Sequence, residues 1–148
     1  MSNYAYNKKA NFNYQILEKY EGGIELLGSE VKAIKAGKAS FEGSFIIIRG
    51  GEVFLINMNI QPYQINNIAK DYNPLRNRKI LITKKEIEEL AKTEKNKSLT
   101  IVPLSLYSKN RKIKIEFAVA KGKKSFDKRE TIKKRDTDRE LRREYKGR

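Results

Sequence analysis

Basic and aromatic side chains alternate in two segments of this sequence. Residues 4–20 combine lysines with tyrosines and a phenylalanine, and residues 70–79 combine a tyrosine with lysines and arginines. Cationic side chains neutralise phosphates, and aromatic faces stack on exposed bases at about 1–3 kcal/mol per base. Nucleic-acid binding is the chemistry that these segments favour, whereas the ordinary alternatives are strand packing for the tyrosines and solvation for the cations. The candidate basic groups are Lys8, Lys9, Lys19, Lys70, Arg76, Arg78 and Lys79, and the candidate aromatic groups are Tyr4, Tyr6, Phe12, Tyr14, Tyr20 and Tyr72.

Groups for covalent or metal chemistry are scarce. The chain has no cysteine and no histidine, which excludes disulfides, thiol chemistry, Cys/His metal sites and a histidine general base. Its glycines do not stand in a phosphate-binding pattern. Carboxylates cluster at residues 86–89, but lysines flank them and favour a solvated salt-bridge face. We therefore expect this protein to have no enzymatic activity, no cofactor and no metal site. A magnesium-dependent nuclease, whose carboxylates must converge in a cleft, is the enzymatic alternative.

Charge and length limit the class of protein. The 148 residues carry 33 Lys and Arg against 18 Asp and Glu, a formal net charge of +15, and 39% of them are apolar. This length and apolar content suit one domain with a modest core. The apolar runs are too short to cross a bilayer, and residues 1–20 lack the apolar region of a secretory signal. We expect a cytoplasmic protein that binds a polyanion and no membrane.

The last 28 residues differ from the rest of the chain. Residues 121–148 hold 13 basic and 6 acidic side chains and only four large apolar residues. Burial of four such side chains does not offset a backbone ordering cost of about 1–2 kcal/mol per residue, so we predict a tail that is disordered in isolation. Two i,i+4 pairs, Glu130 with Lys134 and Asp138 with Arg142, favour a helix once the tail meets a surface.

Residues 1–120 are predicted to be mainly strands. The glycine pair Gly22-Gly23 indicates a bend between two strands, Gly50-Gly51 indicates a two-residue hairpin, and residues 108–111 indicate a second hairpin. Ser29 is predicted to cap a short helix that ends at Gly37, and Thr83 with Glu86 forms a capping box for another. We therefore predict a mainly β fold: a small antiparallel OB-like barrel over residues 1–120, with short helices, followed by the basic tail 121–148. The predicted strands are 14–20, 24–27, 44–49, 52–57, 79–82, 99–107 and 112–119.

Short motifs occur in a definite order along nearly the whole chain. The motifs are Asn7-Lys8-Lys9-Ala10, Tyr20-Glu21-Gly22-Gly23-Ile24, Gly28-Ser29-Glu30-Val31-Lys32, Ala36-Gly37-Lys38-Ala39, Asn59-Ile60-Gln61-Pro62-Tyr63, Arg76-x-Arg78-Lys79-Ile80-Leu81-Ile82, Glu86-Ile87, Thr100-Ile101-Val102-Pro103-Leu104-Ser105-Leu106-Tyr107 and Ala120-Lys121-Gly122-Lys123-Lys124 followed by Phe126-Asp127-Lys128-Arg129. This order resembles the SmpB family, the SsrA-binding proteins that accompany tmRNA in bacterial ribosome rescue.

The resemblance implies a function and a set of partners. It implies an OB-like body that binds the tRNA-like domain of tmRNA and a protein that delivers tmRNA to stalled ribosomes for trans-translation. The tail is then expected to enter the decoding centre of the small subunit and the empty mRNA channel, where it folds as a helix. The family implies no catalytic activity.

Residue roles follow from the same resemblance. The acidic residue before the glycine pair is Glu21, whose alternative role is pairing with a neighbouring lysine. Asn59 and Thr83 depart from the usual family residues, and Ser98 replaces a common glycine. The implied tmRNA-binding residues are Lys8, Lys9, Tyr14, Glu21, Lys32, Lys38, Arg78, Lys79, Leu81 and Thr83. The implied ribosome-binding residues are Lys121, Lys123, Lys124, Phe126, Asp127, Lys128, Arg129, Lys133, Lys134 and Arg135, with Phe126 placed to stack on ribosomal RNA.

One alternative within RNA binding stays open. A ribosomal protein or a general RNA-binding OB module shares the charge, the barrel and the tail. A preference for tmRNA over unrelated RNA of equal length separates the two possibilities.

Overall fold

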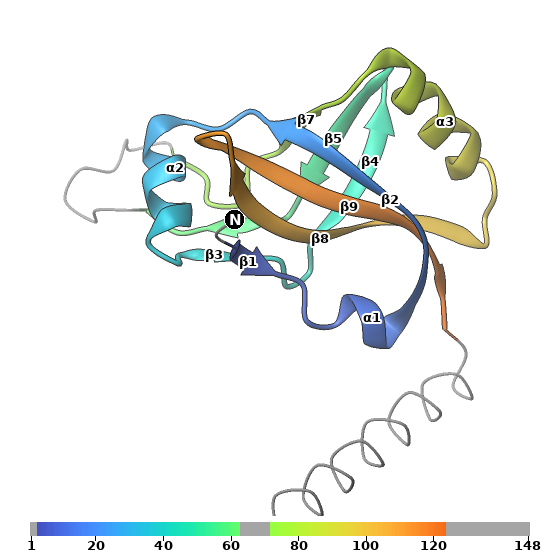
Figure 1. Cartoon of the computed structure of the whole chain (residues 1–148), viewed down its shortest axis with the longest axis horizontal. Coiled ribbons are helices and arrows are strands. Elements are labelled where there is room, and N and C mark those ends of the chain that lie inside the picture. The colour runs from blue at the N-terminus through green and yellow to red at the C-terminus, as the bar shows by residue number, and fades with distance from the viewer. Residues whose placement is uncertain (1–2, 63–71, 124–148) are drawn as a thin grey trace, which may run out of the picture.

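An antiparallel sheet dominates the computed structural model, which describes residues 3–62 and 72–123. Figure 1 shows three long strands, β2, β8 and β9, running across the molecule. The strands are β1 (Asn3–Tyr6), β2 (Tyr14–Ile24), β3 (Ala39–Ser40), β4 (Phe45–Arg49), β5 (Glu52–Ile56), β6 (Asn59–Ile60), β7 (Arg78–Leu81), β8 (Leu99–Lys109) and β9 (Lys112–Gly122). The helices are α1 (Ala10–Asn13), α2 (Gly28–Lys35) and α3 (Lys84–Glu94).

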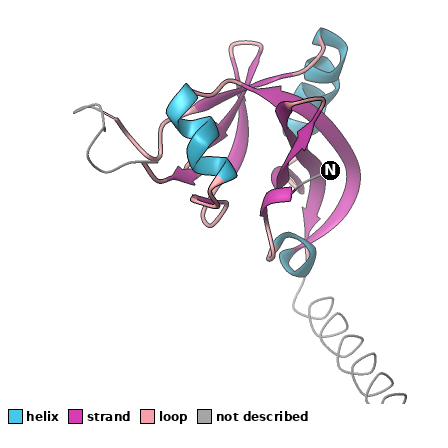
Figure 2. Cartoon of the chain, turned by 60° about the vertical axis from the view of Figure 1, so that its left-hand side comes forward, coloured by secondary structure: helices cyan, strands magenta, loops and turns pink. Residues whose placement is uncertain are grey.

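The main sheet is curved into a partly open barrel. Its seven strands follow the order β1-β8-β9-β2-β7-β5-β4, and β3 pairs with β6 in a separate two-stranded sheet. The edge strand β4 comes back into contact with β8, and α3 packs against both strands. Figure 2 shows the three helices at separate places around the curved sheet. The prediction of a mainly β, OB-like barrel with short helices is confirmed.

Apolar side chains fill the inside of the curved sheet. The core includes Leu55, Ile80, Phe117 and the ring of Tyr20, which stacks on Phe117 with centroids 5.6 Å apart. A smaller apolar cluster lies on the other side of β8 and β9, beside α1. Strand β8 is consequently buried without a break from Ile101 to Tyr107. The smaller cluster consists of Ala10, Val102, Leu104, Ala118 and Ala120.

Local turn and capping signals account for several elements. Gly50 and Gly51 take positive φ angles of 58° and 75° in the hairpin between β4 and β5, as predicted. Asn110 and Arg111 do the same in the turn between β8 and β9. Thr83 caps α3 through the predicted capping box with Glu86.

Three local predictions were wrong. Strand β2 passes straight through Gly22-Gly23 and has its irregularity between Ile16 and Glu18 instead. Helix α2 begins at Gly28 with Leu27 as the N-cap, because the Glu30 carboxylate accepts a 2.8 Å hydrogen bond from the Leu27 N–H. Strand β9 continues to Gly122, three residues past the predicted end of this strand at Val119. Elements β1 and α1 were not predicted.

Gly22 allows β2 and β7 to approach each other closely. A Cβ at this position would lie 2.7 Å from Ile82 Cγ2 and 3.1 Å from the Leu81 carbonyl oxygen. We expect Gly22→Ala to lower the free energy of unfolding by about 1–3 kcal/mol through overpacking, measured by chemical denaturation.

Gly23→Ala is the matched control for this variant. Its added Cβ meets nothing closer than 3.4 Å, at Leu81 Cβ. Equal losses of stability in the two variants would contradict the close-approach explanation.

In the described ranges, 3–62 and 72–123, no helix is long and apolar enough to cross a membrane.

Candidate nucleic-acid interface

Four neighbouring strands present a polar patch on their outer side. Gly23 of β2 stands opposite Leu81 of β7 on one side and opposite Lys114 of β9 on the other. Lys114 in turn stands opposite Tyr107 of β8. Directly opposed residues of antiparallel strands share a face, and residues two apart on one strand do as well. We call this set the β2 face: Glu21, Leu81, Tyr107, Lys109, Lys114 and Glu116, the last of which stands directly opposite Glu21.

Glu21 lies at the centre of the β2 face and is held from β8. The Tyr107 hydroxyl donates a short hydrogen bond to Glu21 Oε2, and Lys109 Nζ lies 3.0 Å from Glu21 Oε1. The bond from Tyr107, and after it the bond from Lys109, lowers the pKa of Glu21. Burial and the same carboxylate raise the pKa of Tyr107. Glu21 is therefore ionised and Tyr107 protonated near neutral pH.

A basic groove adjoins the β2 face at the tip of the β8–β9 hairpin. It has a volume of about 410 Å³ and runs between this tip and α2. Four of its lining residues are cationic, and none of the described lining residues is acidic. Apolar side chains form most of the remaining wall, including Leu81, which is 46% exposed, and Ser108 and Gly23 complete it. We call it the hairpin groove; its cations are Lys35, Arg111, Lys112 and Lys114.

Several residues predicted to bind tmRNA lie on other surfaces. Lys8, Lys9 and Tyr14 line a second groove of about 660 Å³ between the N-terminal segment and residues 39–44, where Lys9 faces Glu42 at 4.0 Å. Lys38 borders a third depression next to Asn59. The sequence prediction therefore combined residues that the fold distributes over more than one surface.

Lys32, Lys79 and Thr83 take further positions. Lys32 is exposed on α2. Lys79 lies on the outer side of β7, where its ammonium group is 3.1 Å from Glu52 Oε1. Thr83 is exposed and caps α3. None of the three lines the hairpin groove.

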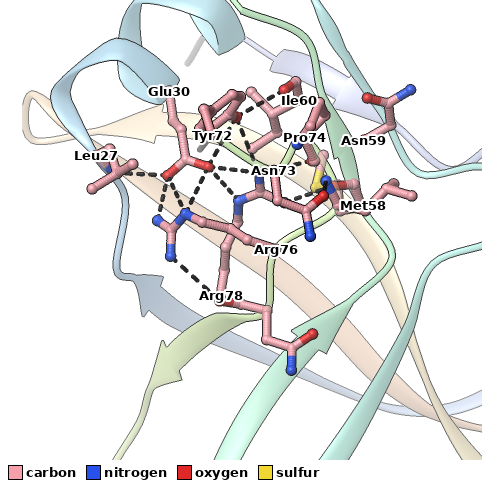
Figure 3. Close-up of polar contacts among 12 residues, drawn as sticks. Leu27, Glu30, Met58, Asn59, Ile60, Tyr72, Asn73, Pro74, Arg76 and Arg78 are labelled. Carbon is pink, nitrogen blue, oxygen red and sulfur yellow. Dashed lines mark hydrogen bonds and ion pairs between the residues drawn. The ribbon is translucent and has the colours of Figure 1, made fainter. Parts of the chain in front are cut away.

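Arg78 requires a correction, because its side chain is fully buried rather than available to phosphates. Its Nε lies 2.8 Å from Glu30 Oε2, and two of its other nitrogens donate to the carbonyl oxygens of Met58 (2.6 Å) and Pro74 (3.0 Å). Figure 3 shows Arg76 and Arg78 converging on the same carboxylate. The guanidinium of Arg78 thus stabilises the fold and cannot contact RNA directly.

Glu30 is the buried acid of this cluster. Burial by itself would raise the pKa of Glu30, but hydrogen bonds from Arg76, from the Leu27 N–H and from Arg78 outweigh it, and the pKa is lowered. The Tyr72 hydroxyl lies 2.8 Å from the Ile60 carbonyl oxygen and 3.2 Å from Glu30 Oε2. The cluster joins α2, β6 and residues 72–78 into one unit.

The residues predicted to bind the ribosome lie mostly outside the described ranges. Lys121 is exposed in β9, opposite Gln15 and Leu99. Lys123 donates from its backbone N–H to the Asn13 carbonyl oxygen (2.9 Å) and from Nζ to the Asn11 carbonyl oxygen (2.7 Å). The structure therefore ties the start of the tail to α1. Outside the described residues are Lys124, Phe126, Asp127, Lys128, Arg129, Lys133, Lys134 and Arg135.

Sequence reasoning missed most of this geometry. The run of cations at the second hairpin was visible in residues 109–114, and it could have indicated the hairpin groove. No local pattern marks Tyr107 as the partner of Glu21, or Glu30 as the partner of Arg78. Among the described residues, no group of three or more Asp and Glu side chains could hold a metal ion.

Comparisons with known proteins agree over nearly the whole chain. A family model described as SmpB protein matches residues 4–147. The SsrA-binding protein of Mesoplasma florum is 52% identical over 142 residues, which cover 96% of this chain and 95% of that relative. The SsrA-binding protein of Thermosynechococcus vestitus is 46% identical over 142 residues, which cover 96% and 93%. A solved chain described as "tmRNA-SmpB: a journey to the center of the bacterial ribosome" is 42% identical, with a TM-score of 0.68 and coverage of 81% of this chain and 84% of that chain.

Proposed function

This chain belongs to the SmpB family, and we propose from that premise that it binds the tRNA-like domain of tmRNA and delivers tmRNA to stalled ribosomes for trans-translation. The observation that carries the proposal on this structure is the position of Glu21. Its ionised carboxylate is exposed on the β2 face and directly adjoins a groove with four cations and no described acid. Such a surface is suited to RNA, which offers phosphates together with uncharged hydrogen-bond donors.

The two parts of this surface have different tasks in the proposal. The cations of the hairpin groove neutralise phosphates, which supplies affinity but little selectivity. Glu21 repels phosphates, so it accepts hydrogen bonds from a ribose hydroxyl or a base edge. Leu81 offers apolar contact between them. Selectivity for one folded RNA then depends on whether its donors reach Glu21 while its backbone lies along the groove.

The tail supplies the ribosomal half of the function. We propose that residues after Lys123 bind small-subunit RNA at the decoding centre and in the mRNA channel. Polyanionic RNA provides the partner for a segment with many cations and few packing groups. The hydrogen bonds of Lys123 to Asn11 and Asn13 support a defined point of departure from the body.

The proposal places the protein in the cytoplasm, where ribosomes translate, and gives it no catalytic step. A nuclease is the enzymatic alternative. Incubating labelled tmRNA with the protein, with and without magnesium, distinguishes them, and magnesium-dependent cleavage would overturn the non-catalytic role.

A competition experiment tests tmRNA binding. Labelled tmRNA is bound in a gel-shift assay and challenged with unlabelled tmRNA or with an unrelated structured RNA of equal length. We expect tmRNA to compete far more effectively. Equal competition would assign the chain to general RNA binding instead.

The cations of the hairpin groove lead to a separate prediction about how RNA affinity depends on salt concentration. The logarithm of the binding constant should fall linearly with the logarithm of salt concentration, with a slope of about 0.7–0.9 per phosphate contact. Arg111→Gln combined with Lys112→Gln removes two groove cations, so we expect a slope shallower by about 1.4–1.8.

The matched control is Lys92→Gln combined with Lys95→Gln, which removes the same charge from exposed positions at the end of α3. This variant should keep the slope of the unmodified protein. If both double variants change the slope equally, net charge rather than the groove governs the affinity.

A further inference from the structure

We infer that Tyr107 is a positioning residue for RNA recognition: its hydroxyl holds the Glu21 carboxylate in the orientation that accepts hydrogen bonds from the RNA. The inference deepens the proposed function and rests on it. Tyr107 itself need not touch RNA, because only 6% of its surface is exposed.

The position of Tyr107 suits it to this task. It lies in β8, whose residues from Ile101 to Tyr107 are all buried and which pairs with β1 on one side and β9 on the other. A side chain in such a strand has little freedom, so its hydroxyl is a fixed point. The hydroxyl donates its hydrogen bond to Glu21 on the outer side of the sheet, although the two residues are 86 positions apart in the sequence.

Each oxygen of Glu21 has one protein partner. Oε2 accepts from Tyr107, and Oε1 faces Lys109 Nζ at 3.0 Å. An ionised carboxylate has about four acceptor positions, so two or so stay open toward a ligand. The side chain is 40% exposed, which gives a ligand access to them. A surface glutamate normally samples several rotamers, and fixing it before RNA arrives lowers the entropy lost on binding.

The test removes only the hydroxyl, by Tyr107→Phe. Loss of one hydrogen bond of this kind predicts tmRNA affinity about threefold to tenfold weaker at fixed salt. Tyr20→Phe is the matched control, because Tyr20 is also buried and directs its hydroxyl at a glutamate, Glu89, at 3.4 Å on the core side of β2. We expect the control to bind tmRNA like the unmodified protein. Unchanged affinity in Tyr107→Phe would overturn the inference.

A double-mutant cycle separates positioning from general destabilisation. Glu21→Gln and Tyr107→Phe are measured singly and together. If Tyr107 acts through Glu21, the double variant binds about as weakly as Glu21→Gln alone. If the two losses multiply, Tyr107 acts independently of Glu21 and the inference fails. Thermal unfolding of all variants shows that the comparison is between folded proteins.

A second readout needs no RNA. Carbon NMR of the Glu21 carboxyl group follows its titration in the unmodified protein and in Tyr107→Phe. We expect the Glu21 pKa to rise when the hydroxyl is removed, and an unchanged titration would contradict the contact. Failure of the unmodified protein to prefer tmRNA would overturn the proposed function, whereas the Glu21 titration decides independently whether Tyr107 holds the carboxylate.

Discussion

A chain that ends at Arg129 is expected to fold, to bind isolated tmRNA with little loss, and to fail completely in peptide tagging on stalled ribosomes. Residues 130–148 contribute few packing groups and much positive charge. The β2 face and the hairpin groove are built entirely from residues that precede the tail. In the proposed function the tail is the part that enters the mRNA channel, so its removal should leave that channel empty. The measurements are tmRNA affinity by gel shift and tag addition on stalled ribosomes.

A second variant makes this result specific to the tail's chemistry. Residues 130–148 are replaced by a glycine-serine segment of the same length, which keeps the chain long but removes its charge and helix-forming pairs. This variant should also bind tmRNA and fail to tag. If truncation weakens tmRNA binding as much as tagging, the tail belongs to the tmRNA-binding surface, and the division into body and tail is wrong.

Glu30→Gln is expected to destabilise the fold by about 3–5 kcal/mol, because it leaves the buried Arg78 without its anion. The carboxylate of Glu30 faces the guanidinium nitrogens of both Arg76 and Arg78 and also accepts from the Leu27 N–H that begins α2. Glutamine keeps the size of the side chain but not its charge. The free energy of unfolding by urea measures the loss.

Glu52→Gln is the matched control, with the same chemical change at an exposed ion pair. Glu52 lies 3.1 Å from Lys79 on the outer side of the sheet, where both side chains are accessible to water. Such a pair contributes about 0–1 kcal/mol. Similar losses in the two variants would mean that the buried cluster contributes no more than a surface ion pair.

The pH dependence of the free energy of unfolding provides an independent check on the direction of the Glu30 pKa shift. The pKa of Glu30 is lower in the folded chain than in the unfolded chain, so its stabilisation is present above the unfolded pKa. It is lost as the pH falls through the folded pKa. The unmodified protein should therefore lose stability more steeply on acidification below about pH 4.3 than Glu30→Gln does. Parallel profiles would contradict this assignment.

Local signals in the sequence were enough to predict the fold class and several of its elements. The pair Gly50-Gly51 indicated the first hairpin, and the polar residues 108–111 between runs of alternating apolar residues indicated the second, since turn geometry and strand faces depend on residues close together in the chain. Thr83 and Glu86 marked the start of α3 for the same reason. The order of motifs indicated the family, and the charge indicated a polyanionic partner, because neither depends on how the chain folds.

Only the tertiary structure decided what individual charged residues do. By residue type and local sequence, Arg78 was expected to be a surface cation. The fold instead brings it to Glu30, 48 residues away, whose carboxylate neutralises the guanidinium and so allows Arg78 to be buried. From the sequence, Glu21 could either contact RNA or pair with a neighbouring lysine. In the fold its carboxylate contacts Tyr107, 86 residues away, and Lys109, 88 residues away. The family resemblance grouped Lys8 and Lys9 with Glu21, but the fold placed them along another groove. Burial and pairing are set by contacts between distant segments, so residue type and local spacing identify a charge but do not determine which partner will neutralise it.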